Sequence, residues 1–220
     1  MTFLSRLFFG RVDFPEGEEF REFQYKFLLV LMVFAGVTTG LFLWLIESGL
    51  SPSLPEMHMR SMRWYTATSF ILWLALRGRK QWFLPLAWIF ELASLLELFS
   101  SAIFVPNDEL RIIWLFTNIP GMYLLLGRVA GGLITALIIV AFVAINPFVA
   151  QPYSPNAIAT GVIAMLYFAA FFHAYARQSI WFFMRMRDSN HQLRELAMRD
   201  MLTGVLNARA YYEVCDSMIR

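Results

Sequence analysis

Charged residues are scarce in this chain. Asp, Glu, Lys and Arg make up 15% of its 220 residues, whereas hydrophobic residues make up 59%. A soluble globular domain is charged at about a quarter of its positions, so this composition excludes that class. It predicts a polytopic membrane protein instead.

Cysteine is also nearly absent. The single residue, Cys215, excludes an intrachain disulfide, and we interpret it as inert. No cleavable signal peptide is recognisable, because the apolar run in residues 1–10 is short and lacks a small-residue cleavage site. The sequence pI is near 8.8, but the basic residues form no compact stripe, so nucleic acid is not an expected partner.

Long apolar runs, by contrast, are abundant. A helix of about 20 apolar residues crosses a hydrocarbon core about 30 Å thick. Breakers such as Pro52, Pro106 and Gly127 separate the runs. The expected spans are residues 25–46, 57–76, 82–104, 110–126, 130–149 and 157–176. The predicted fold is therefore all-α, a six-helix bundle embedded in a lipid bilayer over residues 25–176.

Six spans place both termini on one side, and the basic residues indicate which side. Fifteen Lys and Arg residues fall on the side of the termini, and three, Arg60, Arg63 and Arg111, on the other. The positive-inside rule then predicts cytoplasmic termini. In the N-terminal segment 1–24, the first ten residues are interpreted as an amphipathic helix at the headgroups or as a disordered terminus, and four Glu keep the remainder in water.

Beyond residue 176 the pattern changes from apolar to charged without a helix breaker. Residues 177–199 contain neither Gly nor Pro, so one helix is expected to leave the bilayer and continue as a linker. A seam with alternating spacings of four and three runs along it: Phe182, Met186, Ser189, Leu193 and Leu196. This is the a/d pattern of a short coiled coil, and an ordinary amphipathic helix is the alternative because only about two heptads are present.

The linker ends in residues 199–209, here called the hinge motif, with the sequence Arg-Asp-Met-Leu-Thr-Gly-Val-Leu-Asn-Ala-Arg. It resembles the Asp-x-Leu-Thr-Gly-Leu-x-Asn-Arg-Arg motif that opens the catalytic domain of the GGDEF family of diguanylate cyclases. The matching positions are Asp200, Leu202, Thr203, Gly204, Asn207 and Arg209; Val205 is a mild variant, and Ala208 replaces the first Arg of the pair. The alternative is an ordinary helix-turn-helix corner, with Gly204 in the turn and Thr203 or Asn207 capping the next helix.

The resemblance implies an activity and a partner. In the family this motif couples a signalling helix to an α/β domain that converts two GTP into cyclic di-GMP with Mg²⁺, and two such domains must face each other. Residues 200–220 would begin that domain, with its first helix at 208–218, and the catalytic residues would follow them. We therefore expect no catalytic residue among these 220, a homodimer, and an active parent enzyme in a bacterial cytoplasmic membrane.

Polar residues inside the expected spans are candidates for sensing, since such groups are costly in hydrocarbon. Glu91 and Glu97 lie six residues apart, so they point about 120° away from one another on a helix. Ser94 lies one turn from each, and Ser101 one turn beyond Glu97. These groups could anchor a ligand in a cavity, hold helices together or carry protons.

Two further spans contain candidates. Pro120 removes the amide that would bond the Phe116 carbonyl, and Asn118 beside it offers an amide, so the pair predicts a kink, with or without a ligand cavity. His173 in the last span lies at a depth that could approach Glu91. A packing role for His173 is favoured over haem ligation because no second ligand is convincing.

Arg60 and Arg63 follow the run Glu56-Met57-His58-Met59. Met and His are soft ligands that could bind Cu(I). Met57 and Met59 point to opposed sides of a helix, however, and the two Arg would repel a cation, so no metal is expected. Pairing of the two Arg with Glu47 or Glu56, or attraction of an anionic ligand or headgroup, is favoured.

Together these features predict the membrane sensor and signal-transducing region of a diguanylate cyclase. Abundant Phe, Trp and Leu around a few polar groups favour an apolar or amphipathic small molecule as the ligand. The alternatives are a membrane anchor that only dimerises the enzyme and a small transporter. The transporter is disfavoured because no convincing inverted repeat is visible.

Overall fold

The computed structural model describes residues 3–106, 108, 110–199, 205, 207 and 211. Its elements over that part of the chain are helices, as the sequence predicts. The α-helices are α1 (Phe3–Phe9), α2 (Glu19–Glu47), α3 (Glu56–Leu76), α4 (Phe83–Phe104), α5 (Ile113–Leu125), α6 (Arg128–Ile145) and α7 (Pro155–Met198). Two short 3-10 helices, η1 (Lys80–Trp82) and η2 (Asn146–Phe148), precede α4 and follow α6.

The helices α2 to α7 lie where the apolar runs place them. Four segments are long and apolar enough to cross a membrane: Glu19–Glu47, Lys80–Phe104, Arg128–Phe148 and Pro155–Ser189. Helix α5 has only 13 residues, fewer than the roughly 20 that a perpendicular span needs. Helix α3 has 21 residues but does not reach the same apolarity. The chain thus has the helices of a membrane protein, and the count of six spans stays a prediction.

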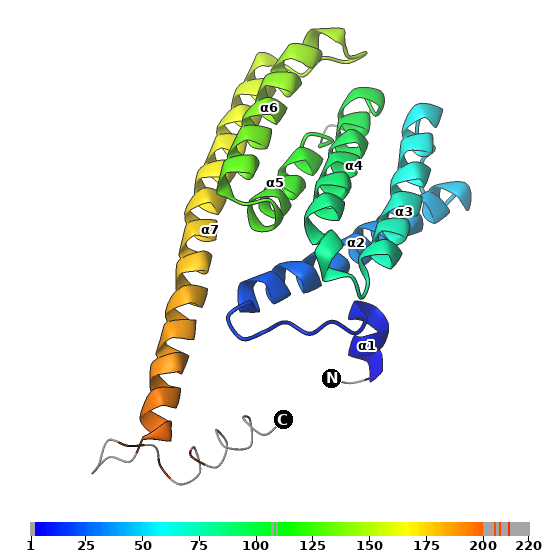
Figure 1. Cartoon of the computed structure of the whole chain (residues 1–220). Coiled ribbons are helices and arrows are strands. Elements are labelled where there is room, and N and C mark those ends of the chain that lie inside the picture. Colours follow the sequence, from blue (N-terminus) through cyan, green and yellow to red (C-terminus); the bar gives the residue numbers. More distant parts are fainter. Residues whose placement is uncertain are drawn as a thin grey trace. The chain divides into compact units, whose positions relative to one another are not determined.

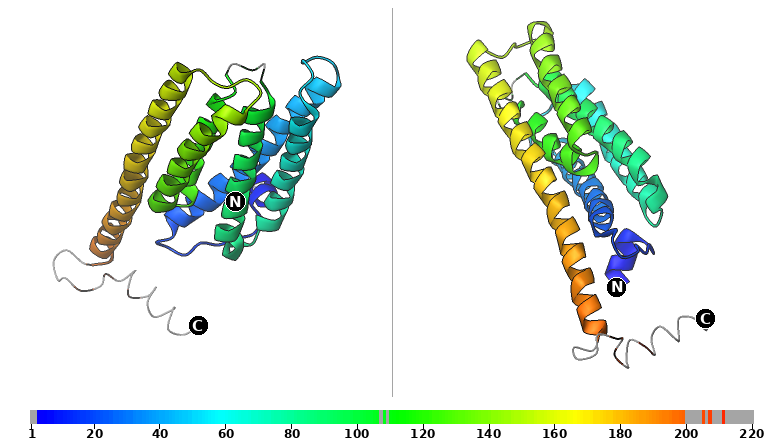
Figure 2. Two further views of the ribbon diagram at one scale, coloured as in Figure 1. Left: turned by 90° about the horizontal axis from the view of Figure 1, so that it is seen from above. Right: turned by 60° about the vertical axis from the view of Figure 1, so that its left-hand side comes forward.

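The chain divides into two compact units, Met1–Arg177 and Gln178–Arg220. In the first unit, helices that follow one another in sequence are neighbours in space: α2 packs on α3, α3 on α4, α4 on α5 and α5 on α6 (Figure 1). Short connections impose this arrangement on consecutive helices. Both views in Figure 2 show the first half of α7 beside α6.

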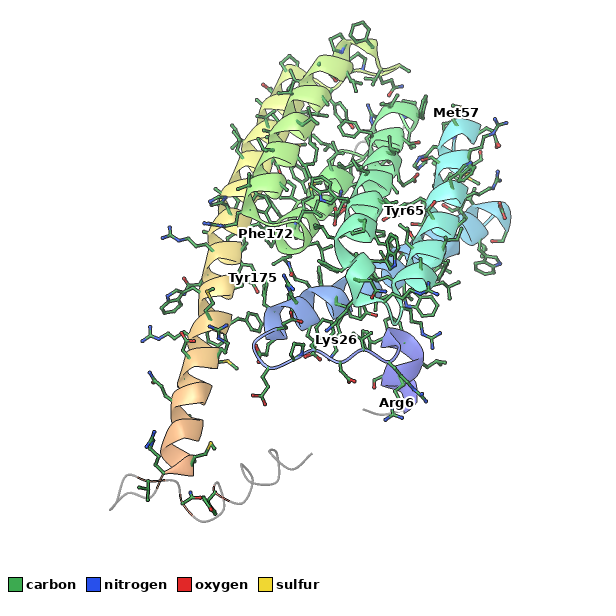
Figure 3. The ribbon with its side chains drawn as sticks, in the orientation of Figure 1. Arg6, Lys26, Met57, Tyr65, Phe172 and Tyr175 are labelled. Carbon is green, nitrogen blue, oxygen red and sulfur yellow. The ribbon has the colours of Figure 1, made fainter. Side chains whose placement is uncertain are left out.

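Helix α5 is the most enclosed helix of the first unit, with eight of its 13 residues buried. Leu115, Ile119 and Met122 belong to an apolar cluster with Ile138 and Phe142 of α6. A second cluster joins Tyr25 and Leu28 of α2 to Tyr65 of α3 and Phe90 of α4. Figure 3 shows Tyr65 between α3 and α4, where its ring centroid lies 6.1 Å from that of Phe90. Apolar packing therefore fixes α3, α4 and α5 on both sides of the region described next.

Residues 3–18, here called the N-terminal strap, close one end of the first unit. Phe8 and Phe9 of α1 pack against the α2–α4 cluster, so this segment is a docked helix and not a disordered terminus. Tyr25 ties the strap down: its hydroxyl donates to the Phe9 carbonyl (2.9 Å) and accepts from the Gly78 amide (2.8 Å). Gly10 lies so close to Gly78 that a Cβ there would be 2.5 Å from the Gly78 nitrogen. Only glycine fits at this crossing.

Arg111 holds the loops at the other end of the first unit. Its guanidinium is buried and donates to the carbonyls of Ala102 (3.2 Å), Pro106 (2.5 Å), Asp108 (3.3 Å) and Gln151 (2.6 Å). It also lies 4.4 Å from the ring centroid of Tyr153. Burial raises the pKa of Tyr153, and the charge of Arg111 acts in the opposite direction. One side chain thus joins the α4–α5 loop to the α6–α7 loop.

In the second unit, Asn207 hydrogen-bonds to the C-terminal end of α7. Its backbone amide donates to the Met198 carbonyl (2.8 Å) and its side-chain amide to the Ala197 carbonyl (2.6 Å), while the Tyr211 amide donates to the Asn207 carbonyl (3.0 Å). The side-chain amide therefore caps the preceding helix. The residues that a cap on the following helix would bond lie outside the described residues. The remaining predicted positions, namely Asp200, Leu202, Thr203, Gly204, Arg209, Cys215 and, apart from Tyr211, the helix expected at 208–218, lie outside the described residues.

Candidate functional site

A row of buried polar residues runs along α4 at every third position: Glu91, Ser94, Glu97 and Ser100. With His58 and Ser61 of α3 and Asn118 of α5, we call this row the polar seam. Three residues advance a helix by about 300°, so each step turns the seam by about 60° around α4. Nine residues turn it by about half a circle. The seam consequently faces α5 at Glu91 and α3 at Ser100.

The α3 side of the seam has two hydrogen bonds and one longer polar contact around Glu97. Ser61 donates from its hydroxyl to Oε2 of Glu97. His58 Nδ1 lies 3.1 Å from the Ser100 hydroxyl and 3.7 Å from Oε1 of Glu97. The side chains of His58 and Glu97 are 7% and 8% exposed. This group of four residues holds α3 to α4 through polar contacts that hydrocarbon strengthens.

The α5 side of the seam is sparsely bonded. Ser94 donates to Oδ1 of Asn118 at 2.9 Å. Glu91 is 1% exposed, and among the described residues neither of its carboxyl oxygens has a hydrogen-bond partner. The side-chain nitrogen of Asn118 is likewise buried without a partner in that part of the chain. Gly121 brings α5 against Glu91, because a Cβ on Gly121 would lie 2.7 Å from Oε1.

The two glutamates therefore turn toward different neighbours, as their spacing predicts. Glu97 meets α3 and Glu91 meets α5. Pro120 lies within α5, next to the residue that packs on Glu91. Because a proline carries no N–H, the regular bond to the Phe116 carbonyl is missing at this turn. Helix α5 is thus weakest where it faces the buried carboxyl group.

Arg60 and Arg63 form the ion pairs that the sequence favoured. Arg60 lies 3.2 Å from Glu56, and Arg63 lies 3.1 Å from Glu47 and 3.5 Å from Glu56. All four side chains are exposed, so each pair stabilises the fold by less than about 1 kcal/mol. These contacts fasten the α2–α3 loop.

His173 lies against α5 rather than in the polar seam. Its ring is exposed and meets the edge of Tyr123 at a centroid distance of 6.1 Å. Met59 and Met62 are buried in a small cluster with Leu43, whereas Met57 is exposed. Within the described residues no three His, Cys, Asp or Glu side chains gather as a metal site would require. The Cu(I) hypothesis thus gains no support from the placement of these residues.

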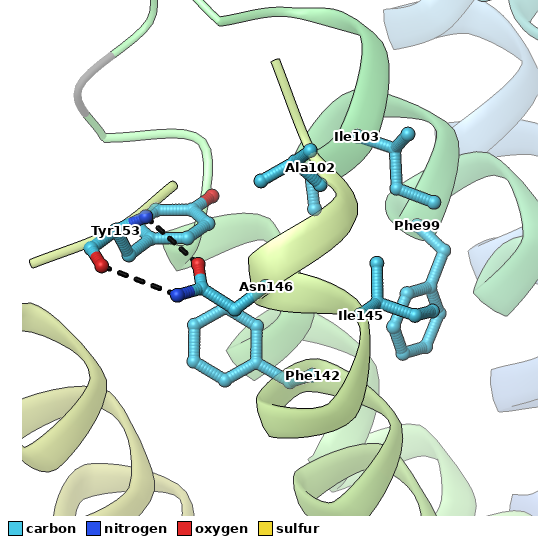
Figure 4. A pocket seen from close by; sticks show the side chains of 8 residues that line it. Phe99, Ala102, Ile103, Phe142, Ile145, Asn146 and Tyr153 are labelled. Carbon is cyan, nitrogen blue, oxygen red and sulfur yellow. Dashed lines mark hydrogen bonds between the residues drawn. The ribbon is translucent and has the colours of Figure 1, made fainter. Parts of the chain in front are cut away.

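A small apolar hollow lies away from the seam, near the α6–α7 loop (Figure 4). Phe99, Ala102, Ile103, Phe142, Ile145, Asn146, Val149 and Tyr153 line it. Asn146 closes one side by bonding Tyr153 twice, accepting from its amide at 2.8 Å and donating to its carbonyl at 3.2 Å. The lining of this hollow includes none of the residues that the sequence proposed for a ligand.

Sequence reasoning missed three of the seven residues of the seam. It treated His58 as part of a possible metal group and did not consider Ser61 or Ser100. The signal was present: His58 and Ser61 lie one turn apart on α3 and are among the residues that lower its hydropathy. A polar face on a helix that must pack in a bundle indicates a polar partner on its neighbour.

Comparison with protein-family models, curated proteins and solved structures found no match for this chain. The functional assignment therefore depends on two features of the chain itself. One is the hinge motif at the end of α7, and the other is the polar seam between α3, α4 and α5.

Proposed function

We propose that this chain is the membrane sensor and signal-transducing region of a diguanylate cyclase. The observation that carries the proposal is the hinge motif, whose Asn207 closes directly on the end of α7. The resemblance of this motif to the GGDEF family supplies the reaction: the intact parent joins two GTP into cyclic di-GMP with Mg²⁺. In this proposal the present residues regulate that reaction and contribute no catalytic group.

The continuity of α7 supports a mechanical role for the linker. A single helix runs from Pro155 to Met198, so residues of the last apolar run and of the linker share one hydrogen-bonded backbone. A helix transmits rotation and translation along its axis because each turn is fixed to the next. Displacement of its apolar part would then reach the hinge motif without being lost in a flexible loop.

The polar seam supports sensing over mere anchoring. An anchor needs only an apolar exterior, yet α3, α4 and α5 bury two glutamates, a histidine and an asparagine between them. Such groups are costly in a membrane and mark functional positions by default. We place the input of the sensor here, with an apolar or amphipathic small molecule reaching the seam from the bilayer.

The proposal includes a homodimer that pairs through the linker. Phe182, Met186 and Leu193 of the a/d seam are 55%, 48% and 60% exposed in the chain by itself, as residues covered by a second copy would be. The side chain of Leu196 lies outside the described set. In the membrane of a bacterium, the excess of basic residues at the termini orients this linker toward the cytoplasm, where GTP is found.

Two measurements on the full-length parent test the proposal. In lipid nanodiscs with GTP and Mg²⁺ we expect cyclic di-GMP as product; absence of that product from a folded dimer would exclude the cyclase.

In a Cys215→Ser background, Met186→Cys and Leu193→Cys should each form an intermolecular disulfide. Met184→Cys is the matched control, since Met184 is also exposed but lies off the seam. Equal cross-linking of all three would exclude this pairing.

A further inference from the structure

Glu91 lacks the partners that a buried carboxylate needs. Its side chain is 1% exposed, and no described residue donates a hydrogen bond to either oxygen. Glu97, on the same helix, receives the hydroxyl of Ser61 and lies near His58. The two glutamates thus lie on one helix and are both buried, but they differ in hydrogen bonding.

No positive charge compensates Glu91 from the helices packed on α4. Helix α5 contains Tyr123 as its single titratable residue, and Tyr123 contacts His173. On α2, the residues between Phe27 and Ile46 include none that titrates. On α3, Tyr65 packs on Phe90 and His58 lies with Glu97; on α4 itself, Glu97 is the other acid. The cation of η1, Lys80, pairs with Glu18 and the Asp13 carbonyl in the strap.

Neither solvent nor a counter-ion has room at the α5 side of this carboxyl group. Gly121 packs so closely that one added carbon would lie 2.7 Å from Oε1. An ionised carboxylate needs donors or a cation on its oxygens, whereas a neutral carboxyl group tolerates apolar surroundings far better. The packed arrangement therefore suits the neutral form.

We propose that Glu91 is a proton-binding site, protonated while α5 packs on it and ionised only when α5 moves away. Helix α5 would bend for that movement at Pro120, where it lacks one backbone hydrogen bond next to the contact between Gly121 and Glu91. Proton release from Glu91 is then thermodynamically coupled to separation of α4 from α5. Proton binding concerns this chain by itself; its use as a stimulus for a cyclase rests on the proposed function.

Infrared spectroscopy of the chain in nanodiscs tests the site without any cyclase readout. At pH 7 we expect the carbonyl stretch of a protonated carboxylic acid in the unaltered protein and in Glu97→Gln, and loss of that band in Glu91→Gln. Raising the pH should bleach the band and, over the same range, accelerate deuterium exchange of the α5 amides around Pro120. Addition of NaCl at constant pH should leave the band unchanged.

Three results would overturn the proposal. Identical spectra for the unaltered protein and Glu91→Gln at pH 7 would mean that Glu91 is ionised. Bleaching without faster exchange in α5 would remove the coupling, and bleaching by NaCl would indicate a cation site. If Glu91→Gln does not fold, ¹³C-labelled glutamate in Glu97→Gln resolves the question, because every other glutamate lies outside the expected spans. The carbonyl band assigned to Glu91 must then shift to lower frequency when the ¹³C label is introduced.

Discussion

The side-chain amide of Asn207 donates a hydrogen bond to the carbonyl oxygen of Ala197 at 2.6 Å, across ten residues of chain. The last carbonyls of a helix have no partner within the helix, so this contact satisfies one of them at the end of α7. It joins the most informative motif of the sequence to the helix that precedes it.

Replacement of Asn207 should loosen this end. Asn207→Ala removes the side-chain donor, and one such hydrogen bond stabilises by about 1 kcal/mol. We expect deuterium exchange at residues 195–198 to rise by roughly fivefold, the factor that corresponds to this energy. Val205→Ala is the control, since Val205 is exposed in the same turn. Equal exchange in both variants would show that the side chain does not hold the helix end.

The contact between Ser61 and Glu97 should appear as an energetic coupling between α3 and α4. In a double-mutant cycle of Ser61→Ala and Glu97→Leu, we expect a coupling of about 1–2 kcal/mol in unfolding from detergent micelles, because the acceptor is a buried carboxyl group. Ser61→Ala combined with Thr135→Ala on α6 is the control, since Thr135 donates within its own helix. That pair should be additive, and additivity of both pairs would contradict the assigned contact.

The packing of α5 on α6 predicts opposite effects at two adjacent glycines. A Cβ on Gly131 would lie 2.8 Å from Cγ and 3.0 Å from Cα of Tyr123, whereas one on Gly132 would meet only the Tyr123 hydroxyl, at 3.6 Å. Gly131→Ala should therefore destabilise by about 1–3 kcal/mol through overpacking. Gly132→Ala should be neutral or stabilising by up to about 1 kcal/mol, as alanine favours helix. Thermal unfolding of both variants checks this, and equal midpoints would contradict the helix contact.

Loss of one hydroxyl should release the N-terminal strap. Tyr25→Phe removes the group that bonds Phe9 and Gly78, so we expect faster proteolysis within residues 9–18 and a loss of about 1–3 kcal/mol in stability. Tyr167→Phe is the control, because Tyr167 is 70% exposed. A strap that stays protected in Tyr25→Phe would mean that the aromatic packing of Phe8 and Phe14 suffices.

The sequence predicts the positions of the helices well because apolar runs and breakers are local signals. It also predicts that Glu91 and Glu97 diverge, since helical geometry alone determines their angle. The pairing of Arg60 and Arg63 with Glu47 and Glu56 is confirmed for the same reason: the partners are close in sequence or across one short loop.

The contacts that sequence reasoning missed are those made between distant segments. The Ser61–Glu97 bond joins residues 36 apart, and Arg111 reaches Gln151 across 40 residues. No periodicity indicates such partners, because they depend on which helices pack together. The shortness of α5 was missed since residues at its N-terminal side, around Leu110, are apolar but lie in a loop.

An insertion in the linker tests whether α7 transmits alignment from the bundle to a cyclase domain. One residue added after Met186 in the full-length parent turns everything beyond by about 100°, whereas seven added residues restore the orientation to within about 20°. We predict that conversion of GTP to cyclic di-GMP changes strongly with the single insertion and returns toward the original rate with seven. Equal rates in all three folded proteins would contradict the account and leave the membrane helices as an anchor.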